Sequence, residues 1–174
     1  METTSTSLSP SAVGLRYGLL TGLISIVFSF FLFITHTDQS PAQWLGLLIF
    51  IGTMVLAHQT FKRENGGFLN YSQGLGIGTI LGGVSGILTT TFRYVYVTFV
   101  DPEWLSRTME IARIKLEEKG GMTDEQIDQG ISMMQKFSSG TFMVISGVIG
   151  SILFGFLIAL VVSAITKHSR PEFE

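Results

Sequence analysis

The stretch that decides the fold is YSQGLGIGTILGGVSGILTTTFRYVYVTFV, residues 71–100. Glycine recurs in it with a spacing of four, and residues four apart lie on one face of an α-helix. Repeated glycine weakens a helix in water, whereas in a bilayer a stripe of small residues lets two helix backbones approach closely. The stretch therefore predicts a membrane-spanning helix that packs through Gly74, Gly78, Gly82 and Gly86.

Two other apolar runs repeat this spacing of small residues. The first run carries Gly14, Gly18 and Gly22, and the last carries Gly147, Ser151, Gly155, Ala159 and Ser163. We expect these stripes to pack the helices of one bundle against each other. The alternative is that one stripe, such as that of the first run, faces outward and binds a second copy of the chain or another membrane protein.

Four apolar runs are each long enough, as a helix, to cross a hydrocarbon core of about 30 Å. The first is not preceded by a basic segment or followed by a small-x-small cleavage site, so it is interpreted as a retained span rather than a signal peptide. We expect a flexible segment over residues 1–13 and one membrane domain over residues 14–174. The expected spans are 14–35, 42–61, 71–100 and 140–166.

The long segment between the third and fourth spans shows signals for two helices. Asp101, followed by Pro102, indicates a helix start with an aspartate cap, and Gly120 with Gly121 indicates its end. Thr123 and Gln126 form a capping box for a second helix. The fold class is therefore all-α: four transmembrane helices, with an amphipathic helical hairpin over residues 102–119 and 124–138.

Composition excludes several classes of protein. Charged residues make up 14% of the chain, against about 25% in a typical soluble domain. The chain has no cysteine, which excludes disulfides, thiol catalysis and cysteine metal sites. No basic face of the kind that binds nucleic acid is present. The expected surroundings are a lipid bilayer.

The distribution of basic residues predicts an orientation. With an even number of spans, Arg16, the Lys62–Arg63 loop and the tail from Lys167 to Arg170 lie on one side of the membrane. The turn at residues 35–41 has no Lys or Arg, so the positive-inside rule places both termini in the cytoplasm. The segment 101–140 carries both charges, but long loops cross membranes with less regard to charge.

Three residues are candidates for a functional role. Arg93 lies inside the third apolar run, where a charge faces a cavity or a partner. Asp101 or Glu103, about two helical turns away, is a potential partner. The alternative is that Arg93 lies at the membrane boundary and reaches the headgroups. His58, near the end of the second span, could relay protons or bind a metal, or it could be hydrogen-bonded to a neighbouring helix.

No catalytic pattern accompanies these residues. The three histidines show no H-x-x-x-H spacing, and the pair Glu117–Glu118 ends an amphipathic helix, which is typical of a solvated face. We therefore expect no catalytic, cofactor-binding or metal site.

From Leu15 onward the chain resembles a bacterial family of integral membrane proteins known as domain of unknown function 4199. The resemblance rests on the loop Glu64–Leu69 that leads into the glycine-rich span, the junction Tyr94–Glu103, the loop Gly121–Ile127 and the following Met134–Phe137. It implies four spans with an extended segment between the third and fourth, and it implies no activity.

The leading hypothesis for function is a non-enzymatic scaffold or partner-binding subunit of the bacterial inner membrane. The alternative is a small transporter or channel-like protein with a polar path near Arg93. The other polar residues that could line such a path are His58, Gln73, Thr79, Thr89, Thr90 and Thr91. A continuous polar cavity at membrane depth would favour transport, and a dry core would oppose it.

Overall fold

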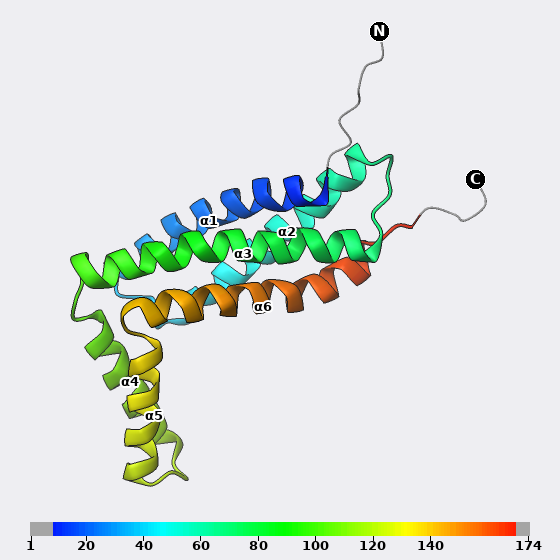
Figure 1. Ribbon diagram of the computed structural model, residues 1–174. Helices are drawn as coiled ribbons and strands as arrows, with labels where there is room; N and C mark the ends of the chain where they lie inside the picture. Colours follow the sequence, from blue (N-terminus) through cyan, green and yellow to red (C-terminus); the bar gives the residue numbers. More distant parts are fainter. Residues whose placement is uncertain (1–8, 170–174) are drawn as a thin grey trace. The chain divides into compact units, whose positions relative to one another are not determined.

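The computed structural model describes residues 9–169, and this part of the chain is built from helices joined by short connections (Figure 1). Four of the helical segments are long and apolar enough to cross a membrane. The predicted all-α membrane fold is therefore confirmed. The elements are α1 (Pro10–Ile34), η1 (Pro41–Gln43), α2 (Trp44–Glu64), α3 (Tyr71–Val95), η2 (Tyr96–Val100), α4 (Trp104–Lys119), α5 (Asp124–Phe137) and α6 (Gly140–Thr166).

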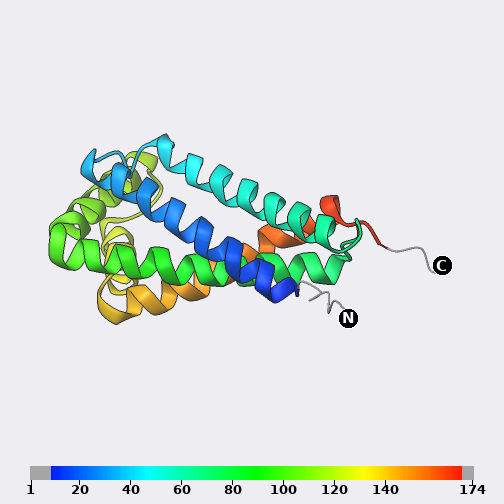
Figure 2. The same ribbon diagram turned by 90° about the horizontal axis from the view of Figure 1, so that it is seen from above.

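The described residues form two compact units. The first contains residues 9–89 and 149–169, which are α1, η1, α2 and most of α3 and α6. The second contains residues 90–148, with α4 and α5. In the first unit the long helices run alongside one another, as Figures 1 and 2 both show.

The first helix begins earlier than the sequence predicted. Ser9 caps it by accepting a hydrogen bond from the backbone N–H of Ala12 at 3.2 Å, and Pro10 occupies the first turn, where its missing N–H costs nothing. Val13 is buried in the core. The expectation of a flexible segment is wrong for residues 10–13, and residues 1–8 lie outside the described part.

The start of α4 also differs from the prediction. Glu103, not Asp101, is the residue before the first helical turn, and its side chain makes no capping hydrogen bond. The Asp101 carboxylate instead forms an ion pair with Arg107, one turn into α4. The π-helical turn η2 lies directly before Asp101. At its end the Asp101 N–H donates a hydrogen bond to the Tyr96 carbonyl at 2.9 Å.

The capping box that starts α5 is confirmed, with Thr123 and Gln126 bonding each other's backbone N–H groups. Arg113 of α4 pairs with Asp128 of α5, and Ile127 is buried. The two helices thus form the expected hairpin.

The core of the first unit is small and apolar. It comprises Val13, Met54, Ala57, Phe61, Leu69, Ile77, Leu81, Ala159 and Val162. Many other apolar side chains point outward: Val27 is 70% exposed and Ile165 is 78% exposed. An apolar surface of this kind suits a lipid solvent and is unfavourable in water.

Candidate functional site

Glycines of α3 meet small residues of α6 in a tightly packed contact, which we call the α3–α6 seam. A methyl group added to Gly82 would lie 2.8 Å from Gly155 Cα and 2.9 Å from the Ser151 carbonyl oxygen. One added to Gly78 would lie 2.5 Å from Ala159 Cβ. Gly74 faces Ser163 and Gly86 faces Ser151 in the same way. The seam therefore leaves room for hydrogen alone at these positions.

The glycines of α1 face the opposite side of α3. Gly14 faces the Ile77 carbonyl oxygen and the Ile80 side chain, and Gly18 faces the Leu81 carbonyl oxygen and the Val84 side chain. Gly22 lies over Ser85 and Leu88. The stripe of the first helix thus packs within the chain, and α3 lies between α1 and α6. In the second unit, Gly147 packs on Thr90.

Hydroxyl groups join α1 to α2. The Thr21 hydroxyl contacts Thr53 Oγ1 at 2.8 Å, and Tyr17 Oη lies 2.6 Å from Thr60 Oγ1. Thr21 is fully buried. Hydrogen bonds between helices are one of the forces that hold membrane bundles together. The sequence reasoning did not single out these residues.

His58 is the centre of a buried polar cluster, which we call the His58 cluster. Its Nε2 donates to the Gly74 carbonyl at 3.0 Å, and its Nδ1 lies 2.8 Å from Thr166 Oγ1. One imidazole thereby links α2, α3 and α6. Because a carbonyl can only accept, Nε2 carries a hydrogen. The one hydroxyl hydrogen of Thr166 is shared between Nδ1 and the Val162 carbonyl, each 2.8 Å from Thr166 Oγ1.

The same end of the bundle holds two further polar features. Lys62 Nζ donates to the Thr166 carbonyl at 3.3 Å, near the end of α6. Within the described residues, Ser163 Oγ is the buried side-chain oxygen that has no hydrogen-bond partner. A β-bridge between Leu69 and His168 ties the start of α3 to the segment after α6.

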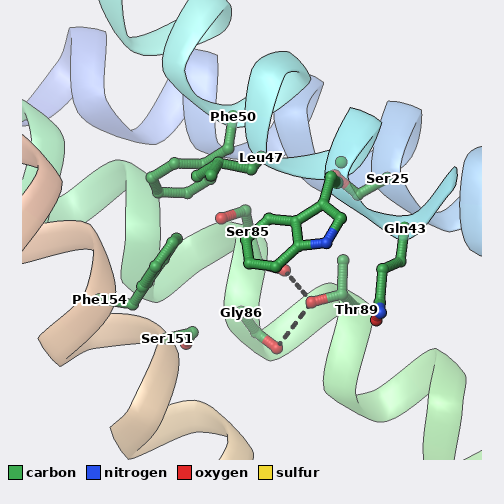
Figure 3. Close-up of a pocket in the computed structure, with 11 residues that line it drawn as sticks. Ser25, Gln43, Leu47, Phe50, Ser85, Gly86, Thr89, Ser151 and Phe154 are labelled. Atoms are coloured by element: carbon green, nitrogen blue, oxygen red, sulfur yellow. Dashed lines mark hydrogen bonds between the residues drawn. The ribbon is translucent and has the colours of Figure 1, made fainter. Parts of the chain in front are cut away.

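A pocket of about 400 Å³ lies at the other end of the first unit, between α1, α2, α3 and α6 (Figure 3). Its lining includes Ser25, Gln43, Leu47, Phe50, Thr89 and Phe154. The rings of Phe50 and Phe154 contact each other with their centroids 5.7 Å apart. None of the described lining residues is ionisable. We call this space the four-helix pocket.

The four-helix pocket and the His58 cluster are separated by packed side chains. On α3, Gly74 of the cluster and Ser85 of the pocket are eleven residues apart, which is about 16 Å along a helix. The side chains of Met54, Ile77 and Leu81 lie between these levels and are fully buried.

The glutamine and threonines that the sequence suggested for a transport path do not line one shared cavity. Thr79 donates its hydroxyl hydrogen to the Leu75 carbonyl at 2.8 Å. Gln73 caps the start of α3 together with Asn70. Thr90 is buried against Gly147 in the second unit, and Thr91 is exposed. Of these residues, Thr89 lines the four-helix pocket.

Arg93 lies two residues before the end of α3, in the second unit. Its guanidinium carbon is 4.5 Å from the ring centroid of Trp104, which is the geometry of a cation–π contact. Asp101 lies on η2's C-terminal side and pairs with Arg107. The Arg93 side chain is exposed, and its functional and membrane-boundary interpretations both stay predictions.

Candidate catalytic groups are not brought together in the described part of the chain. Glu117 pairs with Arg113 at 3.4 Å on the exposed face of α4. Residues 9–169 contain no group of three His, Asp or Glu side chains that could hold a metal ion.

The comparisons with known proteins add a family and no function. The family model described as "Protein of unknown function (DUF4199)" matches residues 16–168. Neither a curated protein nor a solved structure matches the chain.

Proposed function

The chain belongs to the DUF4199 family, and we propose that it is a non-enzymatic membrane protein that acts as a scaffold or partner-binding subunit. We place it in the bacterial inner membrane with both termini in the cytoplasm. The observation that carries the proposal is the α3–α6 seam, where Gly82 and Gly155 meet backbone to backbone.

The seam argues against the alternative of a small transporter or channel. Such a protein needs polar groups along a continuous interior path. Here the polar groups form separate sets: the His58 cluster, the hydroxyl pairs between α1 and α2, and the four-helix pocket. The fully buried apolar side chains of Met54, Ile77 and Leu81 lie between the His58 cluster and the pocket. A bundle closed in this way serves better as a rigid support than as a conduit.

The surface offered to a partner is on α5 of the second unit. Met133 is 62% exposed and Phe137 is 49% exposed. Methionine and aromatic side chains are adaptable contact residues. The buried Ile127 of the same helix faces the hairpin interior, so the exposed pair is available to another molecule.

Two measurements test the proposal. In the first, a photoreactive amino acid replaces Met133 of the full-length chain in cells, and the crosslinked adducts are identified. The control places the same amino acid at Gln135, which is also exposed but lies on another face of α5. We expect a discrete protein adduct from position 133 and none from 135. Lipid adducts alone from position 133 would contradict a partner-binding role.

In the second measurement, the purified chain is reconstituted into liposomes and the flux of protons, sodium, potassium and chloride is recorded. We expect rates equal to those of protein-free vesicles. Flux above that background would replace the scaffold by the channel-like alternative.

A further inference from the structure

The four-helix pocket has the size and position of a ligand site. Its volume of about 400 Å³ falls within the range of small-molecule pockets, about 300–1,000 Å³. Four apolar helices surround it, so a ligand would reach it from the bilayer or from the membrane surface.

The lining favours an uncharged ligand. None of the described lining residues can carry a charge, and the pocket walls are mostly apolar, with Leu47, Phe50 and Phe154 among them. Moving a carboxylate, phosphate or ammonium group from water into such a site without a partner is strongly unfavourable. A charged group inside the pocket is therefore unfavourable.

The hydroxyl groups of α3 act toward the pocket as acceptors. Thr89 Oγ1 donates its one hydrogen to the carbonyl of Ser85 at 2.9 Å or of Gly86 at 3.3 Å, as the dashed lines in Figure 3 mark. Ser85 Oγ donates to the Gly82 carbonyl at 3.2 Å. Since each hydroxyl has one hydrogen, both oxygens have only lone pairs left for a ligand.

A donor lies on the same side of the pocket. Figure 3 places Gln43 beside Thr89 and away from the two phenylalanine rings. The Gln43 carboxamide carries two N–H donors, and Gln43 is one of the residues that line the pocket. A ligand hydroxyl can donate to Thr89 Oγ1 and accept from Gln43, whereas an ether or a ketone can only accept.

From this donor and acceptor pattern we propose that the four-helix pocket binds an uncharged lipid that carries a hydroxyl group. The hydroxyl is held between Thr89 and Gln43, and the chain lies against Phe50 and Phe154. A free long-chain alcohol and a monoacylglycerol share this chemistry. The proposed scaffold role and the proposed lipid site are independent of each other.

The test uses the full-length chain in phosphatidylcholine nanodiscs and two photoreactive probes, a long-chain alcohol and a monoacylglycerol with the same chain. We expect saturable labelling of peptides that contain residues 43–50 and 151–154. The probe that labels at the lower concentration identifies the source of the hydroxyl. Labelling that does not saturate, or that falls only on lipid-facing positions such as Ile165, would overturn the proposal.

Competition tests the hydroxyl itself. Unlabelled alcohol should compete about threefold to tenfold better than its methyl ether, which corresponds to one hydrogen bond. The matching fatty acid, which is anionic, should compete more weakly than either. Equal competition by alcohol and ether would refute the assignment of Thr89 as an acceptor.

Matched variants separate the site from general packing. Thr89→Val should weaken alcohol binding about threefold to tenfold and leave ether binding unchanged. Thr79→Val is the control, because Thr79 makes the same type of backbone hydrogen bond on the same helix outside the pocket. Thr89→Ser should bind as the unmodified chain does. If Thr89→Val does not fold, Leu47→Trp fills the pocket instead and should abolish labelling; persistent labelling would refute the site.

Discussion

Substituting Gly82 by alanine should destabilise the bundle although alanine favours helices. The added methyl group would lie 2.8 Å from Gly155 Cα, and ordinary van der Waals contact begins near 3.4 Å. Backbone atoms cannot rotate away as a side chain can, so α3 and α6 must separate by about 0.6 Å. A gap of that size forfeits a quarter or more of each dispersion contact along the seam.

The net effect follows from two opposing terms. Overpacking costs about 1–3 kcal/mol, and replacing a helical glycine by alanine recovers about 0.5–1 kcal/mol. The two ranges leave a net loss of about 0–2.5 kcal/mol, centred near 1 kcal/mol, which for a chain of this length lowers the midpoint of thermal unfolding by about 2–4 °C.

Gly76 provides the matched control for this measurement. It lies on the same helix, and a methyl group added there would meet nothing within 4 Å. Gly76→Ala should therefore unfold at the same temperature as the unmodified chain or a few degrees higher. Both variants are compared by far-UV circular dichroism in one detergent. If Gly82→Ala and Gly76→Ala unfold together, the close backbone contact in the seam is not real.

Three further predictions concern the remaining polar residues and the orientation. His58→Leu removes the hydrogen bonds that join three helices and should lower the free energy of unfolding by about 1–3 kcal/mol in the same thermal assay. An unchanged midpoint would show that the His58 cluster does not stabilise the bundle. Arg93→Leu loses the cation–π contact with Trp104 and should cost about 0.5–1 kcal/mol with normal expression; loss of a cellular phenotype with intact folding would instead support a functional arginine. Reporter fusions at Asp38 and Gly120 should both indicate the outside, and cytoplasmic signals from both would reverse the orientation.

Hydropathy and local signals located most of the helices. The spans and the hairpin follow from run length and from capping residues, because both depend on neighbours in the sequence. The Asp101 cap failed for a physical reason: the Asp101 carboxylate can reach Arg107, and an ion pair there competes with the N-cap role. The sequence spacing alone does not show whether the Asp101 carboxylate caps the helix or pairs with Arg107.

The partner of each small-residue stripe could not be predicted. The four-residue spacing shows that Gly18 and Gly82 lie on stripes of small residues, but the spacing does not identify the helix against which each stripe packs. The same holds for His58, whose Thr166 contact spans 108 positions of sequence. Thr21 could satisfy its hydroxyl on its own helix through the Tyr17 carbonyl, so its contact with Thr53 has no sequence signal.

The seam and the four-helix pocket are linked by shared residues. Gly86 and Ser151 contact each other at the last position of the seam, and both also line the pocket. Thr89, the next pocket residue along α3, lines the same space. The tight contact that closes the middle of the bundle therefore also sets one wall of the pocket. A change that pushes α3 from α6 at Gly82 must alter that wall, whereas a change at Gly76 leaves it in place, so the same pair of variants measures both the packing of the bundle and the shape of its proposed lipid site.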